Sequence, residues 1–212
     1  MPLQVGVIIE GRGEYGAVRK LLERVWHELL NGDHIDVLRP FRQPRGSLRK
    51  EQRLKAAVDA VKIKLGPETS EGPRKLVLIL IDGEDECPRD LAPQLLKWAQ
   101  EARSDADIAC VLPYPMFETW FAAAASSLAG MNDLPADLTT PEDPEGKGLG
   151  KGWIKKQLAR KYSEPVDQPR FAAKMDLALC RRHSPSFDKL CRELARRLPP
   201  PAQAEGNKAP TA

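Results

Sequence analysis

The sequence lacks the features that mark membrane, secreted and zinc-binding proteins. No apolar stretch approaches the roughly 18 residues that a membrane helix needs, and the opening segment MPLQVGVIIEGRGE has no basic region before its apolar run. The four cysteines form no CxxC pair, and His27, His34 and His183 fall in no HExxH motif. We therefore expect a cytoplasmic protein with free thiols, no zinc site and no membrane partner.

Two enzyme signatures are also missing. No GxSxG elbow surrounds a serine, so Ser184 is expected to cap a helix rather than to act as a nucleophile. The run EGKGLGKGWIKK does not match GxxxxGK[ST], and no strand precedes it. It is either a solvated linker with a helix start or a flexible loop in which Lys147, Lys151 and Lys155 bind phosphate.

The composition is that of an ordinary globular protein with an uneven charge distribution. Hydrophobic residues make up 42% and charged residues 30% of the 212 residues, which favours one domain with a sizeable core. The net charge of +3 hides an acidic segment, 82–145, with 14 acids and three bases. Basic segments flank it: 39–55 has seven bases and one acid, and 147–198 has 14 bases and five acids. Such runs are either solvated helix faces or the surface of a metal-dependent enzyme acting on a phosphate polymer.

Apolar runs alternate with amphipathic segments through the first 113 residues. This alternation predicts an α/β fold with an open, mostly parallel, Rossmann-like sheet of four strands flanked by helices. The expected strands are 3–9, 34–40, 75–81 and 106–113. The expected helices between them are 14–30, 47–65 with Ser47 as its N-cap, and 90–102 capped by Asp90.

The remaining chain predicts a helical extension of this core. The segment PMFETWFAAAASSLAG is expected to be helical, and further helices are expected at 153–161, at 170–182 and from Ser184, with Pro185 in its first turn. The expected organisation is an α/β core, a Pro/Gly-rich loop, a basic helical part packed on the core, and a disordered tail. These parts span 1–130, 131–152, 153–198 and 199–212.

Acidic side chains follow three of the predicted strands. Glu10 ends the first strand, the run LVLILIDGEDECP places Asp82, Glu84 and Asp85 after the third, and Glu118 follows the fourth. Ligands of open α/β sheets sit at the carboxyl ends of the strands, so these carboxylates are expected to converge there. Carboxylates that repel one another need compensation, and Mg²⁺ takes such hard oxygen ligands.

The turn after the first strand supports a competing interpretation. GRGEYG, residues 11–16, matches GxGxxG between a strand and a helix, which is the context of a dinucleotide site. Glu10 and Glu14 flank the place where a pyrophosphate would lie and would repel it without a metal. Arg39, at the end of the second predicted strand, could accept a ribose phosphate, so an NADP-binding protein stays an alternative.

Four motifs in order resemble a known family. IIEGRGE, LILIDGEDECP, LPYPMFETWFAA and HSPSFDKL together resemble the Toprim-like proteins of the overcoming-lysogenization-defect (OLD) nuclease type. The match is to a small Toprim-related bacterial family often encoded beside AAA- or ABC-type ATPases, and it covers most of residues 3–198. The resemblance implies a Toprim-like fold that binds Mg²⁺ or Mn²⁺ and cleaves nucleic-acid strands.

The resemblance also implies roles for individual acids. Glu10 matches the glutamate after strand one, Glu14 the second acid of that turn, and Asp82 the first acid of a DxD pattern. The second acid of that pattern is Glu84 here, whose carboxylate is displaced by about one methylene, a shift that matters in a positioned site. Asp85 could share its role, and Glu118 occupies the acid of a later FE-W motif.

The sequence therefore predicts a metal-dependent nuclease that hydrolyses the phosphodiester bonds of nucleic acid. The resemblance adds an AAA- or ABC-type ATPase as a possible partner. Glu10, Asp82 and Glu84 are the expected catalytic residues. The expected metal ligands are Glu10, Glu14, Asp82, Glu84, Asp85 and Glu118. The residues expected to bind phosphate are Arg12, Lys147, Lys151, Lys155 and Arg181. The substrate is DNA or RNA, a homo-oligomer is a further expectation, and a role in phage defence is a hypothesis. The alternative from another class is a non-catalytic partner or regulator of an ATPase.

Overall fold

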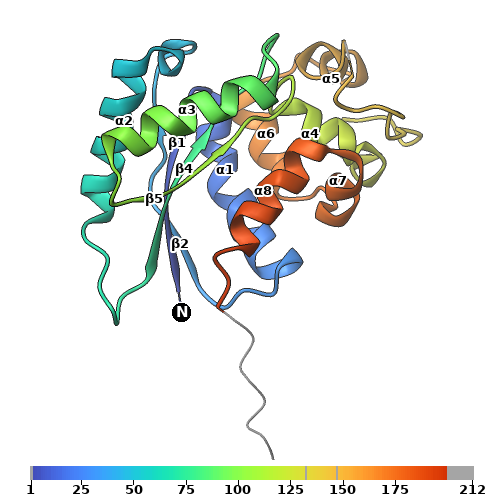
Figure 1. The fold of residues 1–212 in the computed structure, drawn as a ribbon. Helices are drawn as coiled ribbons and strands as arrows, with labels where there is room; N and C mark the ends of the chain where they lie inside the picture. Colours follow the sequence, from blue (N-terminus) through green and yellow to red (C-terminus); the bar gives the residue numbers. More distant parts are fainter. Residues whose placement is uncertain (1, 132, 147, 200–212) are drawn as a thin grey trace, which may run out of the picture.

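A parallel β-sheet forms the centre of the molecule (Figure 1). The computed structural model describes residues 2–131, 133–146 and 148–199. The strands are β1 (Leu3–Ile9), β2 (Ile35–Val37), β3 (Phe41–Arg42), β4 (Arg74–Leu80) and β5 (Asp107–Val111). Their order is β2-β1-β4-β5, β3 also pairs with β1, and every pair is parallel. The predicted α/β class with a parallel sheet is confirmed.

The predicted count of four strands is wrong, because a further short strand, β3, follows directly after the second predicted segment, 34–40. β2 pairs with the start of β1, where Leu3 lies opposite Ile35, and β3 pairs with its end, where Ile8 lies opposite Phe41. Pro40 lies between β2 and β3 and has no N–H to donate, so the pairing with β1 is interrupted at this residue and continues from Phe41. The sheet therefore has five strands.

Helices cover both faces of the sheet. Their bounds are α1 (Arg12–Arg24), α2 (Glu51–Leu65), α3 (Pro88–Ala102), α4 (Glu118–Ala123), α5 (Lys151–Gln157), α6 (Glu164–Ala172), α7 (Leu177–His183) and α8 (Pro185–Ala195). A π-helical turn, η1 (Val25–Leu29), extends α1, and the 3₁₀ turns η2 (Ser47–Arg49) and η3 (Ala125–Leu128) precede α2 and follow α4.

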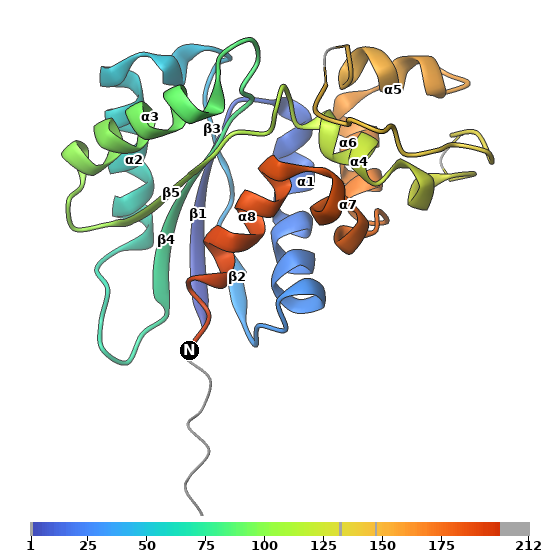
Figure 2. The same ribbon diagram turned by 45° about the vertical axis from the view of Figure 1, so that its right-hand side comes forward.

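The two faces carry separate hydrophobic cores. α2 and α3 cover one face and pack on alternate strand residues such as Ile8, Val77 and Ile79 (Figures 1 and 2). α1 and the C-terminal helices cover the other face, where they pack on Val7 and Leu78. Both faces of β1 and β4 are buried, which explains why these strands are continuous apolar runs.

Several predicted helix boundaries are wrong for local reasons. Ser47 does not cap α2: its hydroxyl donates to the carbonyl of Pro44 at 2.6 Å within η2, and the extended Lys50 separates η2 from α2. Asp90 lies in the first turn of α3, which begins at Pro88. The prediction for Ser184 is confirmed, because its Oγ accepts from the Phe187 N–H at 3.1 Å and Pro185 opens α8.

The predicted C-terminal helices also differ in extent. α5 ends at Gln157, earlier than expected, and the segment 170–182 contains the end of α6 and most of α7 rather than one helix. Residues 133–146 and 148–150 contain neither helix nor strand, and the predicted tail at 200–212 lies outside the described residues. No helix in the described part of the chain is long and apolar enough to span a membrane.

Candidate functional site

An acidic cleft lies at the carboxyl edge of the sheet, where the strand ends and the C-terminal helices meet. Its volume is about 250 Å³. The residues that line it are Glu10, Gly11, Arg12, Glu14, Arg42, Arg45, Asp82, Glu118, Lys151, Glu164 and Gln168. The structure thus brings together Glu10 and Asp82, which follow β1 and β4, and Glu14 and Glu118, which lie in the first turns of α1 and α4. The sequence predicts this convergence for the ends of parallel strands.

Glu10 lies directly after β1 and is 7% exposed. Its Oε1 accepts from the Leu48 N–H at 3.4 Å, and its Oε2 lies 3.6 Å from Nη1 of Arg49. Burial raises the pKa of Glu10, while the Leu48 N–H and the Arg49 guanidinium oppose that rise. The carboxyl is therefore held at the wall of the cleft by groups that favour its charged form.

Glu14 lies in the first turn of α1 and is 5% exposed. Its Oε2 accepts from the Gly11 N–H at 3.3 Å, so its carboxyl folds back over the start of its own helix. Burial, followed by the negative charge of Asp82, raises the pKa of Glu14 to about 8. Ionising this carboxyl in the folded protein therefore costs free energy unless a cation lies nearby.

Asp82 follows β4, and its Oδ1 accepts from the Phe117 N–H at 2.8 Å. That bond joins the end of β4 to the start of α4. Burial, followed by the charge of Glu118, raises the pKa of Asp82 to about 7, although the Phe117 N–H and Lys151 oppose the rise. The buried Glu14 and the half-buried Asp82 therefore each raise the free-energy cost of ionising the other.

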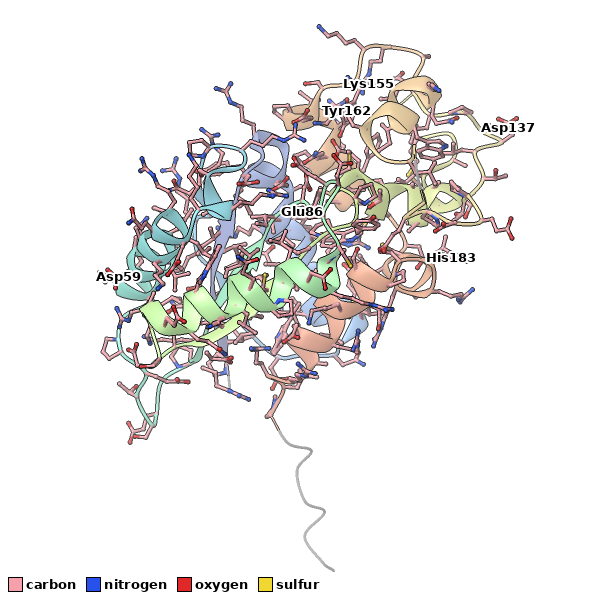
Figure 3. The ribbon with its side chains drawn as sticks, turned by 45° about the horizontal axis from the view of Figure 1, so that its top comes forward. Asp59, Glu86, Asp137, Lys155, Tyr162 and His183 are labelled. Atoms are coloured by element: carbon pink, nitrogen blue, oxygen red, sulfur yellow. The ribbon has the colours of Figure 1, made fainter. Side chains whose placement is uncertain are left out.

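Glu118, at the start of α4, is 1% exposed and is held by the C-terminal helical part. Its Oε1 accepts from the Tyr162 hydroxyl and from Nε2 of Gln168, each at 3.1 Å. Nζ of Lys151 lies 3.9 Å from the same oxygen. Tyr162, labelled in Figure 3, reaches the cleft from the segment between α5 and α6.

Gly13 permits this arrangement by letting α6 approach α1 closely. A Cβ at residue 13 would stand 2.3 Å from Oε1 of Gln168 and 2.8 Å from the carbonyl oxygen of Glu164. Any larger residue would push α6 outward and move the Gln168 amide away from Glu118. A glycine of the GxGxxG pattern thus serves helix packing in this chain.

Arginine side chains from the segment between β3 and α2 bind the acidic turn that follows β4. Nη2 of Arg49 donates to the Asp82 carbonyl at 2.8 Å, and its Nε donates to Glu86 at 2.5 Å. Nε of Arg45 donates to Glu84 at 2.6 Å. Figure 3 shows Glu86 in the turn that precedes α3. These bonds tie the acidic turn after β4 to the segment that follows β3.

Glu84 and Asp85 were expected to be metal ligands, but neither lines the cleft. Glu84 has a φ of 55°, a left-handed conformation uncommon for a non-glycine residue, and its N–H donates to the Pro115 carbonyl at 2.7 Å. Its side chain points to Arg45 and does not line the cleft. Asp85 is exposed and lines a neighbouring cavity of about 630 Å³.

The predicted phosphate-binding residues are divided between the cleft and other surfaces. Arg12 and Lys151 line the cleft, and Nζ of Lys151 pairs with Glu164 at 2.7 Å. Lys155 lines a separate cavity of about 660 Å³. Arg181 pairs with Asp188 at 2.8 Å across α7 and α8 and is remote from the cleft lining. Lys147 lies outside the described residues.

Several residues of the cleft were missed by the sequence interpretation. The high content of basic residues in 39–55 indicated that this segment contributes arginines to the site, but it did not single out any one of them. No sequence signal marked the helix-borne partners of Glu118. The missed residues are Arg42, Arg45, Arg49, Tyr162, Glu164 and Gln168.

The donor chemistry of the cleft suits a hard divalent cation. Carboxylate oxygens are the ligands that Mg²⁺ and Mn²⁺ prefer, and a cation would relieve the repulsion that raises the pKa values of Glu14 and Asp82. Within the described ranges, no three His, Cys, Asp or Glu side chains form a group already spaced to hold a metal. The residues therefore fit a metal by type and burial, and side-chain rearrangement would have to complete the coordination.

The comparisons with known proteins identify a family. A family model described as a domain of unknown function (DUF4276) matches residues 9–195. None of the curated proteins and none of the solved structures matches the chain. The matched range contains every carboxylate of the cleft.

Proposed function

The chain belongs to the family of the domain of unknown function DUF4276, and we propose that it is a Mg²⁺- or Mn²⁺-dependent nuclease that hydrolyses phosphodiester bonds. One observation carries the proposal: four carboxylates from separate elements converge in a cleft whose rim bears arginines and a lysine. Acids hold a metal and bases hold a phosphate backbone, so the combination suits a metal-assisted hydrolase. The resemblance to Toprim-like nucleases supports the same activity.

We assign the metal to Asp82, Glu14 and Glu118, with Glu10 as a further ligand or as the general base. When bound, the divalent cation supplies an activated nucleophile and compensates charge on the scissile phosphate. Glu10 suits proton transfer because burial raises its pKa while Arg49 keeps its carboxyl oriented.

The basic side chains of the rim would hold the nucleic-acid backbone. Arg12, Arg42 and Arg45 line the cleft, and the side chain of Arg45 is 68% exposed. An exposed guanidinium can exchange a carboxylate partner for a phosphate, which it binds with the same paired N–H geometry. Arg45 would then leave Glu84 when substrate binds.

The decisive experiment compares the wild type with Asp82→Asn and Glu10→Gln on plasmid, single-stranded DNA and tRNA, with Mg²⁺ or Mn²⁺. Asp137→Asn is the matched control, because Asp137, labelled in Figure 3, is an exposed acid that lines a different cavity and is not part of the cleft lining. We expect cleavage to fall at least about 10³-fold in both cleft variants and to be unchanged in the control. Cleavage that persists in both cleft variants would rule out this site.

Metal binding supplies a second readout, because the resemblance also implies an ATPase partner on which cleavage could depend. Titration with Mn²⁺ by calorimetry should give binding to the wild type and much weaker binding to Asp82→Asn. A folded wild type that binds neither metal at millimolar concentration would contradict the nuclease proposal.

A second candidate is a non-catalytic regulator of an ATPase. The observation that favours it is the set of arginines that already neutralise the acidic turn: Arg45 pairs with Glu84, and Arg49 pairs with Glu86 and lies near Glu10. In this alternative the chain needs no metal, so metal binding separates the two candidates.

NADP binding is less well supported by the geometry. The carboxyl of Glu14 accepts from the Gly11 N–H at the start of α1, where a pyrophosphate would need free N–H groups. Arg39 hydrogen-bonds to the Tyr15 hydroxyl. A rise in NADPH fluorescence or in melting temperature on adding the cofactor would revive this alternative.

A further inference from the structure

A groove runs along β5, the last strand of the sheet. β5 pairs with β4 and, among the described residues, with no other strand, so its outer edge has no partner. α3 and α8 flank this edge (Figure 2). The cavity between them has a volume of about 800 Å³, and it adjoins the cavity of about 630 Å³, with which it shares Arg89 and Lys189.

The floor of this groove is apolar. Ile108 and Cys110 from β5 line it together with Ala92 and Leu96 from α3. In the described part of the chain, no group of α3 or α8 hydrogen-bonds to the backbone of β5. An unpaired strand edge beside apolar pockets can accept a further strand, because the backbone supplies the hydrogen bonds and the pockets take alternate side chains.

The charge of the groove is positive. Five basic residues line the larger cavity, against the two acids Asp107 and Glu193. Both acids are already paired: Nη2 of Arg197 lies 2.5 Å from Asp107, and Nζ of Lys189 lies 2.9 Å from Glu193. The other basic lining residues are Arg74, Arg89 and Arg196.

Two of these arginines have no compensating charge. Arg74 and Arg89 form no ion pair with any residue within 2–131, 133–146 and 148–199. The same excess of positive charge disfavours a second copy of the chain, because two positive grooves would face each other. Charge complementarity therefore favours an acidic occupant.

We propose that the groove between α3 and α8 binds an extended segment of a partner protein that alternates apolar and acidic side chains and adds to β5 as a strand. Its apolar side chains would cover Ile108 and Cys110, and its acids would pair with Arg74 and Arg89. This docking surface is separate from the acidic cleft and does not depend on the proposed nuclease activity.

The test uses a fluorescein-labelled ten-residue peptide that alternates valine and glutamate, with a valine-lysine peptide as the charge control. Fluorescence anisotropy measures binding to the wild type, to Arg74→Glu/Arg89→Glu, and to Lys155→Glu/Lys161→Glu as a matched charge reversal elsewhere. Glutamate at residue 89 suits the first turn of α3, so the groove variant should fold, and circular dichroism checks this.

We expect the glutamate peptide to bind the wild type and the Lys155→Glu/Lys161→Glu control equally. Binding to Arg74→Glu/Arg89→Glu should weaken at least about tenfold. Hydrogen exchange should show the amides of residues 107–111 protected by the peptide, as strand addition requires. Equal binding of the lysine peptide, equal loss in both variants, or no binding at millimolar concentration would overturn the proposal. A wild-type dimer that dissociates in the groove variant would overturn it in favour of a second copy.

Discussion

Buried acids occur in two contrasting surroundings in this molecule. Asp167, in α6, is fully buried, and Arg160 pairs with it at 2.5 Å while the Ser163 N–H donates at 2.7 Å. Burial alone would raise the pKa of Asp167, but the hydrogen bonds from Arg160 and Ser163 outweigh it and lower the pKa. Its charge is compensated within the fold.

Glu14 and Asp82 are the opposite case. Among the described residues no Lys, Arg or His lies within ion-pair distance of either carboxyl, and burial together with neighbouring acids raises both pKa values. The contrast shows that burial of an acid does not by itself mark a site. What distinguishes Glu14 and Asp82 is that no basic side chain of the described residues forms an ion pair with them, although Arg49 and Lys151 lie near Glu10 and Glu118. Acids without such a partner are where an external cation is expected.

Removing the compensated acid should produce the largest loss of stability. Asp167→Ala leaves the Ser163 N–H without an acceptor and leaves Arg160 with Asp133 as its remaining ion-pair partner, so we expect the loss of these charge-assisted hydrogen bonds to lower the free energy of unfolding by about 3 kcal/mol. Urea unfolding at pH 7 measures it, with Asp137→Ala as the control. The pKa of Asp167 is lowered, so this stability is present above pH 3.8 and is lost as the pH falls through the folded-state pKa. A loss below about 1 kcal/mol would contradict the proposed compensation.

Removing an uncompensated acid should instead stabilise the metal-free protein. Glu14→Gln keeps the shape of the side chain without its charge, and we expect a gain of about 2 kcal/mol at pH 8.5 in EDTA. Because the pKa of Glu14 is raised from 4.5 to about 8, its favourable contribution is present below pH 4.5 and is lost as the pH rises through 8. The gain should therefore nearly vanish at pH 5. A destabilised variant at pH 8.5 would show that Glu14 is compensated after all.

Divalent metal should act on the same acids in the same pH range. At a fixed free Mn²⁺ concentration that is tenfold above the dissociation constant at pH 8, the wild type should gain about 1.4 kcal/mol at pH 8. The same Mn²⁺ concentration should stabilise it less at pH 6, because the ligands must lose protons to bind the metal. Thermal unfolding measures this, with Ca²⁺ and Na⁺ as ionic controls. An equal stabilisation of Glu14→Gln would place the metal elsewhere.

The smallest effect is expected at Glu84. Aspartate tolerates a φ of 55° better than glutamate does, and the side chain lies outside the cleft lining, so Glu84→Asp should change stability by less than about 0.5 kcal/mol. If the proposed nuclease activity is present, it should change less than about tenfold. A collapse of activity as large as that of Asp82→Asn would show that Glu84 enters the cleft during catalysis.

The sequence predicts the positions of acids that directly follow a strand better than the positions of acids within a turn. Glu10 and Asp82 end apolar runs of parallel strands, and carboxyl ends of parallel strands share one edge, so their convergence follows from the pattern. Glu84 could not be placed in this way. Its direction depends on a left-handed turn residue and on its bond to Pro115, neither of which a local pattern reveals.

The partners of the acids depend on contacts that are distant in sequence. Arg49 approaches Glu10 from a turn 39 residues later in the chain. Tyr162 reaches Glu118 from the segment between α5 and α6, and Gln168 reaches it from α6, and no sequence periodicity specifies how these segments pack. Helix ends were also misplaced where competing local bonds exist, as in the hydroxyl bond of Ser47. Local patterns thus locate the acids, whereas tertiary packing decides which of them are compensated.

The absence of a side chain at Gly13 has a consequence for how the chain can be divided. Because α6 rests directly on α1 at this residue, Gln168 and Tyr162 become part of the surroundings of Glu118. A fragment that ends at residue 130 would keep Glu10, Glu14, Asp82 and Glu118 and lose Glu164 together with both groups that hold Glu118. The unit that can be inherited, transplanted or expressed with an intact cleft therefore extends through α6.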